Sequence, residues 1–192
     1  MHKKFHFKDF LLQNNTYFIF LILIVICSVL SDSFLSVMNI KNIALQQAGP
    51  VCIVLGMLFV IFTGGIDLSV GSLMALGGAT ACWLIVNSGM HFIPAVGIAL
   101  GIGFLGGLLT GVLVAYCKFQ GFVASLAVMT IARGLALVVT NGSPIRVDNG
   151  TLNCLASPQY GYPMLLIAIF LIILFIIIQR FTSYGRIVIA IE

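Results

Sequence analysis

The chain alternates long apolar runs with short polar connections, and this alternation determines which elements the sequence predicts. A hydrocarbon core about 30 Å thick is crossed by roughly 20 apolar residues in helical form. Runs of about this length recur along the whole chain. The pattern therefore predicts an all-α polytopic bundle in one membrane domain over residues 1–192. About six spans are expected, near residues 17–35, 44–62, 70–87, 92–116, 122–139 and 163–179.

Composition strengthens this prediction. Hydrophobic residues make up 61% of the chain and charged residues 7%, with a mean hydropathy of +1.20. A soluble domain carries about 25% charged residues, so nine basic and five acidic side chains cannot cover a water-exposed surface of this size. The same figures exclude disordered, collagen-like and disulfide-scaffold proteins. The five cysteines show no metal-binding spacing.

The basic residues lie in small groups beside apolar runs, which is typical of topology signals and not of a nucleic-acid-binding face. Only Lys41 and Arg146 face outward when the chain is threaded with its N-terminus inside. The positive-inside rule therefore predicts a cytoplasmic N-terminus. The polar connection at residues 140–162 is then outside, as a linker or, alternatively, as a docking surface for an extracytoplasmic partner. The basic residues on the cytoplasmic side are Lys3, Lys4, Lys8, Lys118, Arg180 and Arg186.

Small residues recur at every fourth position in the run near residues 92–116. Gly103, Gly107 and Gly111 form one such row. In lipid, helices associate through close backbone contact, and small residues at this spacing permit it. The row therefore predicts tight helix packing, with a pore-lining face as the alternative.

One polar stretch, residues 63–72, interrupts the apolar sequence with paired glycines, an acid and two hydroxyl groups. Two geometries are open. If the preceding span starts near Asn42, the acid lies at the cytoplasmic interface; if it starts near Pro50, the glycine pair breaks the helix inside the membrane. Broken helices at depth line cavities or are buried in protein, and they mark translocation sites. The candidate residues are Gly64, Gly65, Asp67, Ser69, Gly71 and Ser72.

Helix capping is a second role for this stretch, and it is compatible with the first. Asp67 or Ser69 can accept a hydrogen bond from the first turn of the helix that begins near Val70. In both roles the sequence predicts an interrupted helix near Gly64 and Gly65.

Arg133 is a further candidate because it lies about 16 Å into the run that starts at Phe122. An arginine at that depth is expected to face the bundle interior, a wet cavity or an acid. Asp67 is the only acid between Asp32 and Asp148. We therefore hypothesise an Asp67–Arg133 ion pair. The alternative is that Arg133 bonds helix-end carbonyl groups for purely structural reasons.

The sequence contains no recognisable catalytic constellation. It has no paired carboxylates, no HExxH helix and no Ser/His/Asp set. It also lacks the GxxxxGK[ST] phosphate loop. We therefore expect no enzymatic activity, metal or cofactor in this chain, and its energy must come from a gradient or from another subunit.

Three motifs carry a resemblance to a known family. Residues 63–72, TGGIDLSVGS, resemble the signature of the permease subunits of ribose-type carbohydrate ABC importers. Residues 122–136, FVASLAVMTIARGLA, give a second match, and residues 182–186, TSYGR, a third and weaker one. The similarity covers most of the chain from Asn39 onward.

The two stronger motifs together supply the candidate translocation-path residues, to which the second motif adds Thr130 and Arg133. The chain departs from the family pattern at two places. Gln120 and Gly121 stand where members usually carry a proline, and residues 125–127 read Ser-Leu-Ala where Thr-Leu-Gly is common.

The resemblance implies a permease of the bacterial inner membrane that forms a sugar path with a second permease copy, in a homo- or heterodimer. It implies an ATP-binding partner subunit, which holds ATP and Mg, and an extracytoplasmic sugar-binding protein. No nucleic acid is implied. Family members continue into a cytoplasmic loop that couples to the ATPase. We therefore expect this chain to be truncated before that loop, or to be one piece of a split permease.

Two other classes of protein stay open from the residues alone. A gradient-driven secondary transporter or channel would use Asp67 in a broken helix as a proton or ion site. A membrane assembly protein without transport would tolerate replacement of Asp67 and Arg133. The solute is not defined by the sequence, since ribose, other pentoses, hexoses and furanosyl molecules all fit.

Overall fold

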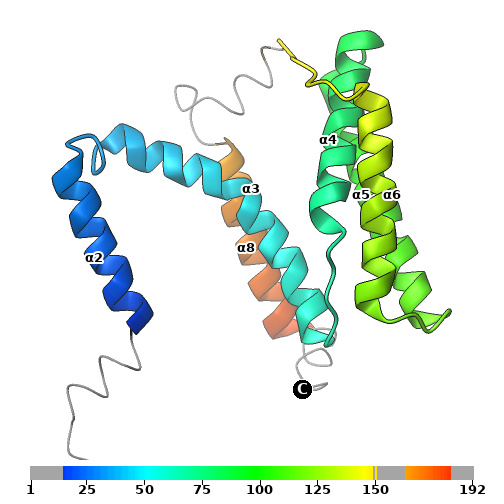
Figure 1. Cartoon of the computed structure of the whole chain (residues 1–192), viewed down its shortest axis with the longest axis horizontal. Helices are drawn as coiled ribbons and strands as arrows, with labels where there is room; N and C mark the ends of the chain where they lie inside the picture. The colour runs from blue at the N-terminus through cyan, green and yellow to red at the C-terminus, as the bar shows by residue number, and fades with distance from the viewer. Residues whose placement is uncertain (1–14, 149, 151–162, 183–192) are drawn as a thin grey trace, which may run out of the picture. The chain divides into compact units, whose positions relative to one another are not determined.

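The computed structural model describes residues 15–148, 150 and 163–182, and within these residues every regular element is a helix (Figure 1). The all-α prediction is therefore confirmed. The helices are α2 (Asn15–Leu30), α3 (Val37–Phe62), α4 (Val70–Asn87), α5 (Phe92–Ala115), α6 (Gly121–Thr140) and α8 (Pro163–Phe181). Several sequence predictions concern residues outside the described part: Lys3, Lys4, Lys8, Arg186, residues 151–162 and residues 183–186.

Five of the described helices, α3, α4, α5, α6 and α8, are long and apolar enough to cross a membrane. The first apolar helix, α2, has 16 described residues and is shorter than the roughly 20 that a span needs. For the last four of the six predicted spans, the predicted and observed bounds agree closely. The polytopic helical prediction is thus confirmed.

The chain divides into two compact units, residues 1–46 and residues 47–192. In the first unit, α3 begins at Val37, well before the predicted residue 44. The Ser36 Oγ accepts a hydrogen bond of 3.2 Å from the Asn39 N–H, and the Asn39 side-chain amide donates to the Phe34 carbonyl at 2.7 Å. These bonds satisfy polar groups at the helix start. Hydropathy misses this beginning because the first turns of α3 carry polar side chains.

Pro50 does not end α3, which continues as one helix from Val37 to Phe62. Proline removes one backbone donor, but membrane helices tolerate it where neighbouring groups satisfy the freed carbonyl. The polar stretch is therefore preceded by one continuous helix that contains Pro50.

The second unit is built around α4, α5 and α6, which lie side by side (Figure 1). Their shared core contains Leu76 of α4 and Ala132 and Ala136 of α6, all at most 9% exposed. Partly buried side chains of Leu73, Ile102 and Val139 pack against this core. Alanines dominate the buried positions, as expected where helices associate in lipid through close backbone approach.

Gly77 and Gly106 make the closest approaches between α4 and α5. A Cβ added at Gly77 would lie 3.0 Å from the Ala99 carbonyl oxygen, and one added at Gly106 would collide with the Leu73 side chain. The predicted row behaves differently, since a Cβ at Gly103, Gly107 or Gly111 would meet nothing within 4 Å. Close packing in this part of the chain therefore depends on Gly77 and Gly106 and not on the every-fourth-residue row.

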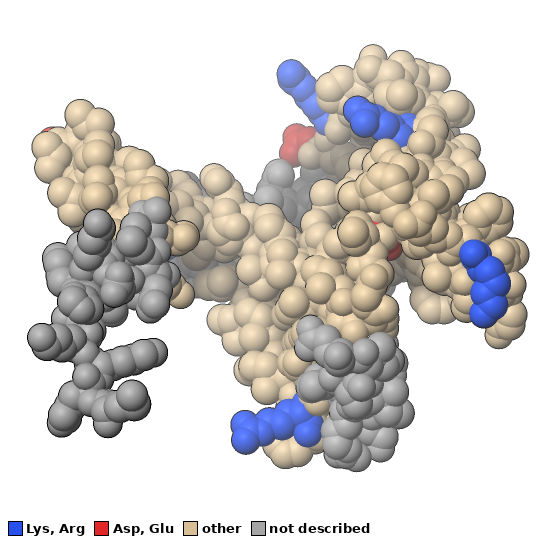
Figure 2. All heavy atoms as spheres, turned by 60° about the horizontal axis from the view of Figure 1, so that its bottom comes forward, with Lys and Arg blue, Asp and Glu red and all other residues tan. Residues whose placement is uncertain are grey.

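Most large apolar side chains of the described helices are exposed. On the face drawn in Figure 2, the charged side chains are few and lie on an otherwise uncharged surface. In the second unit, α3 contacts α8 through Phe59 and Phe175, whose ring centroids are 4.5 Å apart. An apolar exterior of this kind is what a protein surrounded by lipid requires.

The Gly77 contact predicts the effect of a single methyl group. Gly77→Ala would place a Cβ against backbone that cannot move without separating α4 from α5. We expect it to destabilise the purified chain in detergent by roughly 1–3 kcal/mol, the usual cost of overpacking, measured as a lower Tm. Gly101→Ala is the matched control because a Cβ there meets nothing within 4 Å. Equal Tm values for the two variants would contradict the packing argument.

Candidate functional site

The polar stretch interrupts the helical structure as predicted: α3 ends at Phe62, α4 begins at Val70, and residues 63–69 are not helical. A tight turn closes α3, because the Gly64 N–H donates to the Ile61 carbonyl at 2.9 Å and the Gly65 N–H to the Val60 carbonyl at 3.0 Å. Gly64 has φ +70°, a left-handed conformation that residues with a side chain adopt only at a cost. The glycine pair thus permits the chain to leave α3 sharply.

Asp67 fixes the residue at which α4 begins. Its Oδ1 accepts two hydrogen bonds from Ser69, one from the backbone N–H at 2.7 Å and one from Oγ at 2.6 Å. Ser69 is fully buried, and its carbonyl accepts the first helical bond from the Leu73 N–H at 2.9 Å. The predicted cap on the first-turn N–H groups is not formed, since the side chain of neither Asp67 nor Ser69 accepts a bond from that turn. Asp67 instead orients the N-cap residue itself.

The interrupted stretch lies beside α5 and α6 and not beyond their ends (Figure 1). Asp67 lines a cavity together with Gly107 and Gly111 of α5. These glycines lie about 6–12 Å from the end of α5 at Ala115, at 1.5 Å per residue. The helix before the break thus begins early, at Val37, and the extended stretch then runs back beside α5.

Ser125 joins the interrupted stretch to α6. Its fully buried Oγ donates to the Ile66 carbonyl at 3.4 Å, sharing this donor with the Phe122 carbonyl at 3.1 Å. Next to it, a Cβ at Gly121 would lie 3.9 Å from the same Ile66 oxygen. The second turn of α6 thus supplies a hydroxyl to a carbonyl that lies outside any helix.

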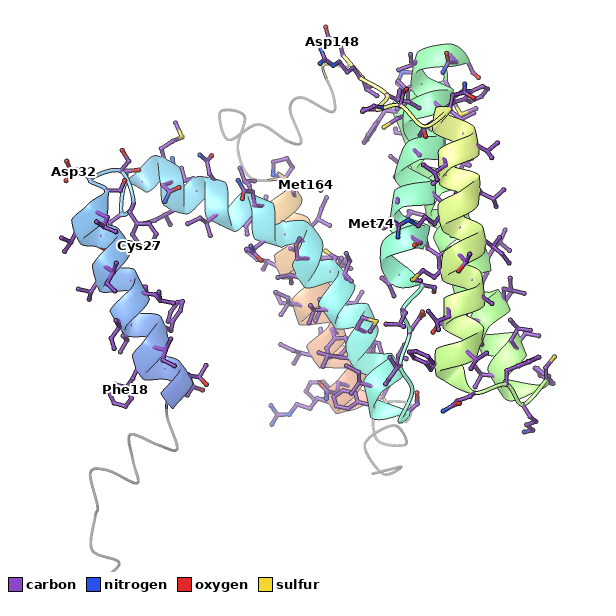
Figure 3. The ribbon with its side chains drawn as sticks, viewed as in Figure 1. Phe18, Cys27, Asp32, Met74, Asp148 and Met164 are labelled. Carbon is purple, nitrogen blue, oxygen red and sulfur yellow. The ribbon has the colours of Figure 1, made fainter. Side chains whose placement is uncertain are left out.

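Two cavities meet at Asp67. The larger, of about 960 Å³, lies between α3, α4 and α5, with Met164 of α8 at its edge. Figure 3 shows Met74 on the side of α4 that faces α3 and α8, in agreement with its place in this lining. The smaller, of about 250 Å³, lies between the interrupted stretch and the second half of α5. Both cavities are lined by Val60, Asp67 and Gly107.

The glycine row of α5 lies along these cavities. Gly103 and Gly107 line the larger one, and Gly107 and Gly111 line the smaller one. Within the described chain the row therefore borders cavities and makes no close helix contact.

The structure does not bring Arg133 to Asp67. Arg133 is exposed on α6, about 18 Å from the helix start at Gly121. No ion pair joins it to Asp67, whose one engaged oxygen is bound to Ser69. Thr130, one turn earlier, is also exposed and donates to the Leu126 carbonyl at 2.9 Å. The other candidates, Gly71 and Ser72, form the first turn of α4.

Two residues at the site were not found from the sequence. Ser125 lies within the second motif, but its contact with Ile66 joins positions 59 residues apart. Thr110 is a lone hydroxyl in an apolar run, where an internal bond to the helix is the usual expectation. It is 8% exposed and lines the smaller cavity. No local pattern marks either residue, because both roles arise from packing between helices.

Comparison with known proteins agrees with this architecture. Residues 39–192 match the family described as branched-chain amino acid transport system / permease component, and the chain belongs to this family. It is 41% identical to the ribose import permease protein RbsC of Escherichia coli (strain K12) over 143 residues, which are 74% of this chain and 44% of the relative. The corresponding protein of Bacillus subtilis (strain 168) is 37% identical over 190 residues, 96% of this chain and 58% of the relative.

A third relative, the galactofuranose transporter permease protein YtfT of Escherichia coli (strain K12), is 40% identical over 144 residues, 73% of this chain and 42% of the relative. The chain thus spans about half the length of the curated relatives that it matches. No solved structure shows significant similarity to it. The resemblance to carbohydrate importer permeases is confirmed, and the chain is a multi-pass membrane protein.

The bonds of Asp67 predict unequal effects of two substitutions. Asp67→Ala removes the single oxygen that accepts both hydrogen bonds from Ser69. We expect a loss of about 1 kcal/mol in stability, the usual effect of losing a helix-start bond. Asp67→Asn keeps a carbonyl oxygen in place and should lose less. Thermal unfolding of the purified chain in detergent measures both.

Asp32→Ala serves as the matched control, because Asp32 lies in the short turn between α2 and α3, outside the family match. If Asp67→Ala and Asp32→Ala unfold at the same temperature as the unaltered chain, Asp67 does not stabilise the start of α4.

Proposed function

We propose that the chain is the membrane-spanning permease subunit of a binding-protein-dependent ABC importer for a sugar, and that it forms part of the sugar path. The observation that carries this proposal is the family match over residues 39–192 together with the names of the relatives. Those names specify ribose, galactofuranose, fructose and L-arabinose. All of these are neutral monosaccharides.

The interrupted stretch supports the same proposal on physical grounds. Non-helical backbone at membrane depth is tolerated where it is buried in protein or lines a water-filled cavity. Residues 63–69 meet this condition, since they lie beside α5 and α6 and line a cavity. Interrupted helices of this kind form solute sites in transporters. Asp67 supplies the charged group of this stretch.

Partners complete the proposed importer. The sequence has no phosphate-binding loop, so an ATP-binding subunit on the cytoplasmic side supplies ATP and Mg. A second permease copy shares the path, and a soluble sugar-binding protein delivers the solute from outside. The distribution of basic residues supports a cytoplasmic N-terminus, with Lys118 and Arg180 inside and Lys41 and Arg146 outside. The proposed location is the bacterial inner membrane.

Deletion of the gene in its own host, followed by return of the unaltered gene on a plasmid, tests the function. We expect the deletion to abolish uptake of one radiolabelled monosaccharide and the plasmid to restore it. Uptake should persist when a protonophore collapses the gradient and stop when ATP is depleted, because hydrolysis by a partner drives it. Uptake that fails under the protonophore while ATP is maintained would instead identify a gradient-driven transporter.

The same cells test the interrupted stretch. Asp67→Asn should lower uptake while leaving the amount of protein in the membrane unchanged, since the amide preserves the bonds to Ser69 but removes the charge. Asp32→Asn, the same chemical change outside the family match, should transport normally. Normal uptake by Asp67→Asn would show that the proposed path does not need the charge of Asp67.

A further inference from the structure

The smaller cavity offers hydrogen-bond acceptors on its wall. Thr110 Oγ1 donates to the Gly106 carbonyl at 3.1 Å, and Thr63 Oγ1 donates to the Val60 carbonyl at 2.8 Å. Each hydroxyl group has then used its one hydrogen, so its oxygen remains as an acceptor only. The Asp67 Oδ2 accepts no hydrogen bond from any described residue. The three polar side chains of this cavity therefore present oxygen acceptors.

Backbone donors belong to the same wall. Ile66 and Asp67 line the cavity and lie outside any helix. Within the described part of the chain, their N–H groups donate to no acceptor. Ile66 is exposed and Asp67 is partly buried, so both N–H groups are open to water or to a ligand that accepts hydrogen bonds.

This mixture of groups suits a solute that both donates and accepts hydrogen bonds. A neutral polyol fits, because each hydroxyl group is both a donor and an acceptor. An anion fits poorly beside the Asp67 carboxylate, and an apolar solute would leave the acceptors and donors unpaired. The larger cavity lacks this mixture, since no hydroxyl side chain lines it and Asp67 is its one charged group.

Space in the cavity is consistent with a small solute. Its volume of about 250 Å³ lies below the roughly 300–1,000 Å³ of pockets for drug-sized ligands. A Cβ added at Gly107 or Gly111 would meet nothing within 4 Å, so these glycines leave the cavity open along α5.

We propose that the smaller cavity is a monosaccharide-binding site in which Thr110 and Asp67 accept hydrogen bonds from sugar hydroxyl groups. The proposal rests on the proposed function and deepens it, because it assigns a solute class to one place in the chain. It adds Thr110 as a residue that contacts the solute.

Protection of a cysteine from maleimide tests the site in the purified full chain. The native cysteines are replaced by serine or alanine, and Gly111→Cys places one thiol at the cavity. Ribose, galactose, fructose and L-arabinose are the probes. We expect at least one of them to slow labelling in a concentration-dependent manner, and leucine, which carries a carboxylate, to have no effect. Val114→Cys, on the same cavity wall, provides a second thiol in case Gly111→Cys itself blocks the site.

Thr110→Val tests the contact, since it keeps the side-chain shape and removes the hydroxyl oxygen. It should weaken the apparent affinity for the protecting sugar about fivefold, as expected for one neutral hydrogen bond. Thr80→Val is the matched control. Thr80 Oγ1 makes the same type of bond, to the Leu76 carbonyl at 2.8 Å, but does not line the cavity. This variant should keep the original affinity.

The outcomes separate this site from the proposed function. If the host cells import a monosaccharide but no sugar protects either thiol, the binding-site proposal is wrong and the proposed function stands. The binding-site proposal is also wrong if sugar protects the thiol with equal apparent affinity in Thr110→Val and Thr80→Val. Protection by leucine and not by sugars, together with no sugar uptake in cells, overturns both proposals.

Discussion

In a lipid environment every backbone polar group needs a partner within the protein, and this constraint governs the whole second unit. Residues 63–69 leave the helical hydrogen-bonding pattern, so the protein must satisfy them by other means. Asp67 accepts two bonds from Ser69, and Ser125 of α6 donates to the Ile66 carbonyl. Both serines are fully buried. The break is therefore held by specific hydrogen bonds, from Asp67 within the stretch and from Ser125 of α6, and is not a loosely connected loop.

Close packing makes those contacts possible. Gly77 and Gly106 bring α4 and α5 together, and alanines of α6 fill the space beside Leu76. Helices in lipid gain little from burying apolar side chains, because the lipid is equally apolar, so small residues and close contact must supply the association. The same residue type serves the opposite purpose on another side of α5. There Gly103 and Gly107 border open space, and the absence of side chains maintains the cavity.

Much of the fold could be predicted from hydropathy and from a few local signals. The spans follow from the length of the apolar runs, and the break follows from Gly64 and Gly65, since both are properties of neighbouring residues. Other features depend on contacts between distant parts of the chain. The polar first turns of α3 concealed its start, and an Asp67–Arg133 pair was inferred from charge alone, although Arg133 is exposed and Asp67 binds Ser69. Which glycines pack and which line a cavity depends on how the helices are rotated, which periodicity does not specify.

The bond between Ser125 and Ile66 also limits the order in which the protein can be assembled. Ser125 is made 59 residues after its acceptor, so the ribosome has released the interrupted stretch long before α6 exists to receive it. Until then the non-helical backbone has no hydroxyl partner from α6, and exposing it to hydrocarbon is unfavourable. The hydrogen bond to the Ile66 carbonyl therefore forms only after α6 has been synthesised. A variant that slows the synthesis or insertion of α6 would prolong this waiting state and expose the nascent chain to quality-control proteolysis.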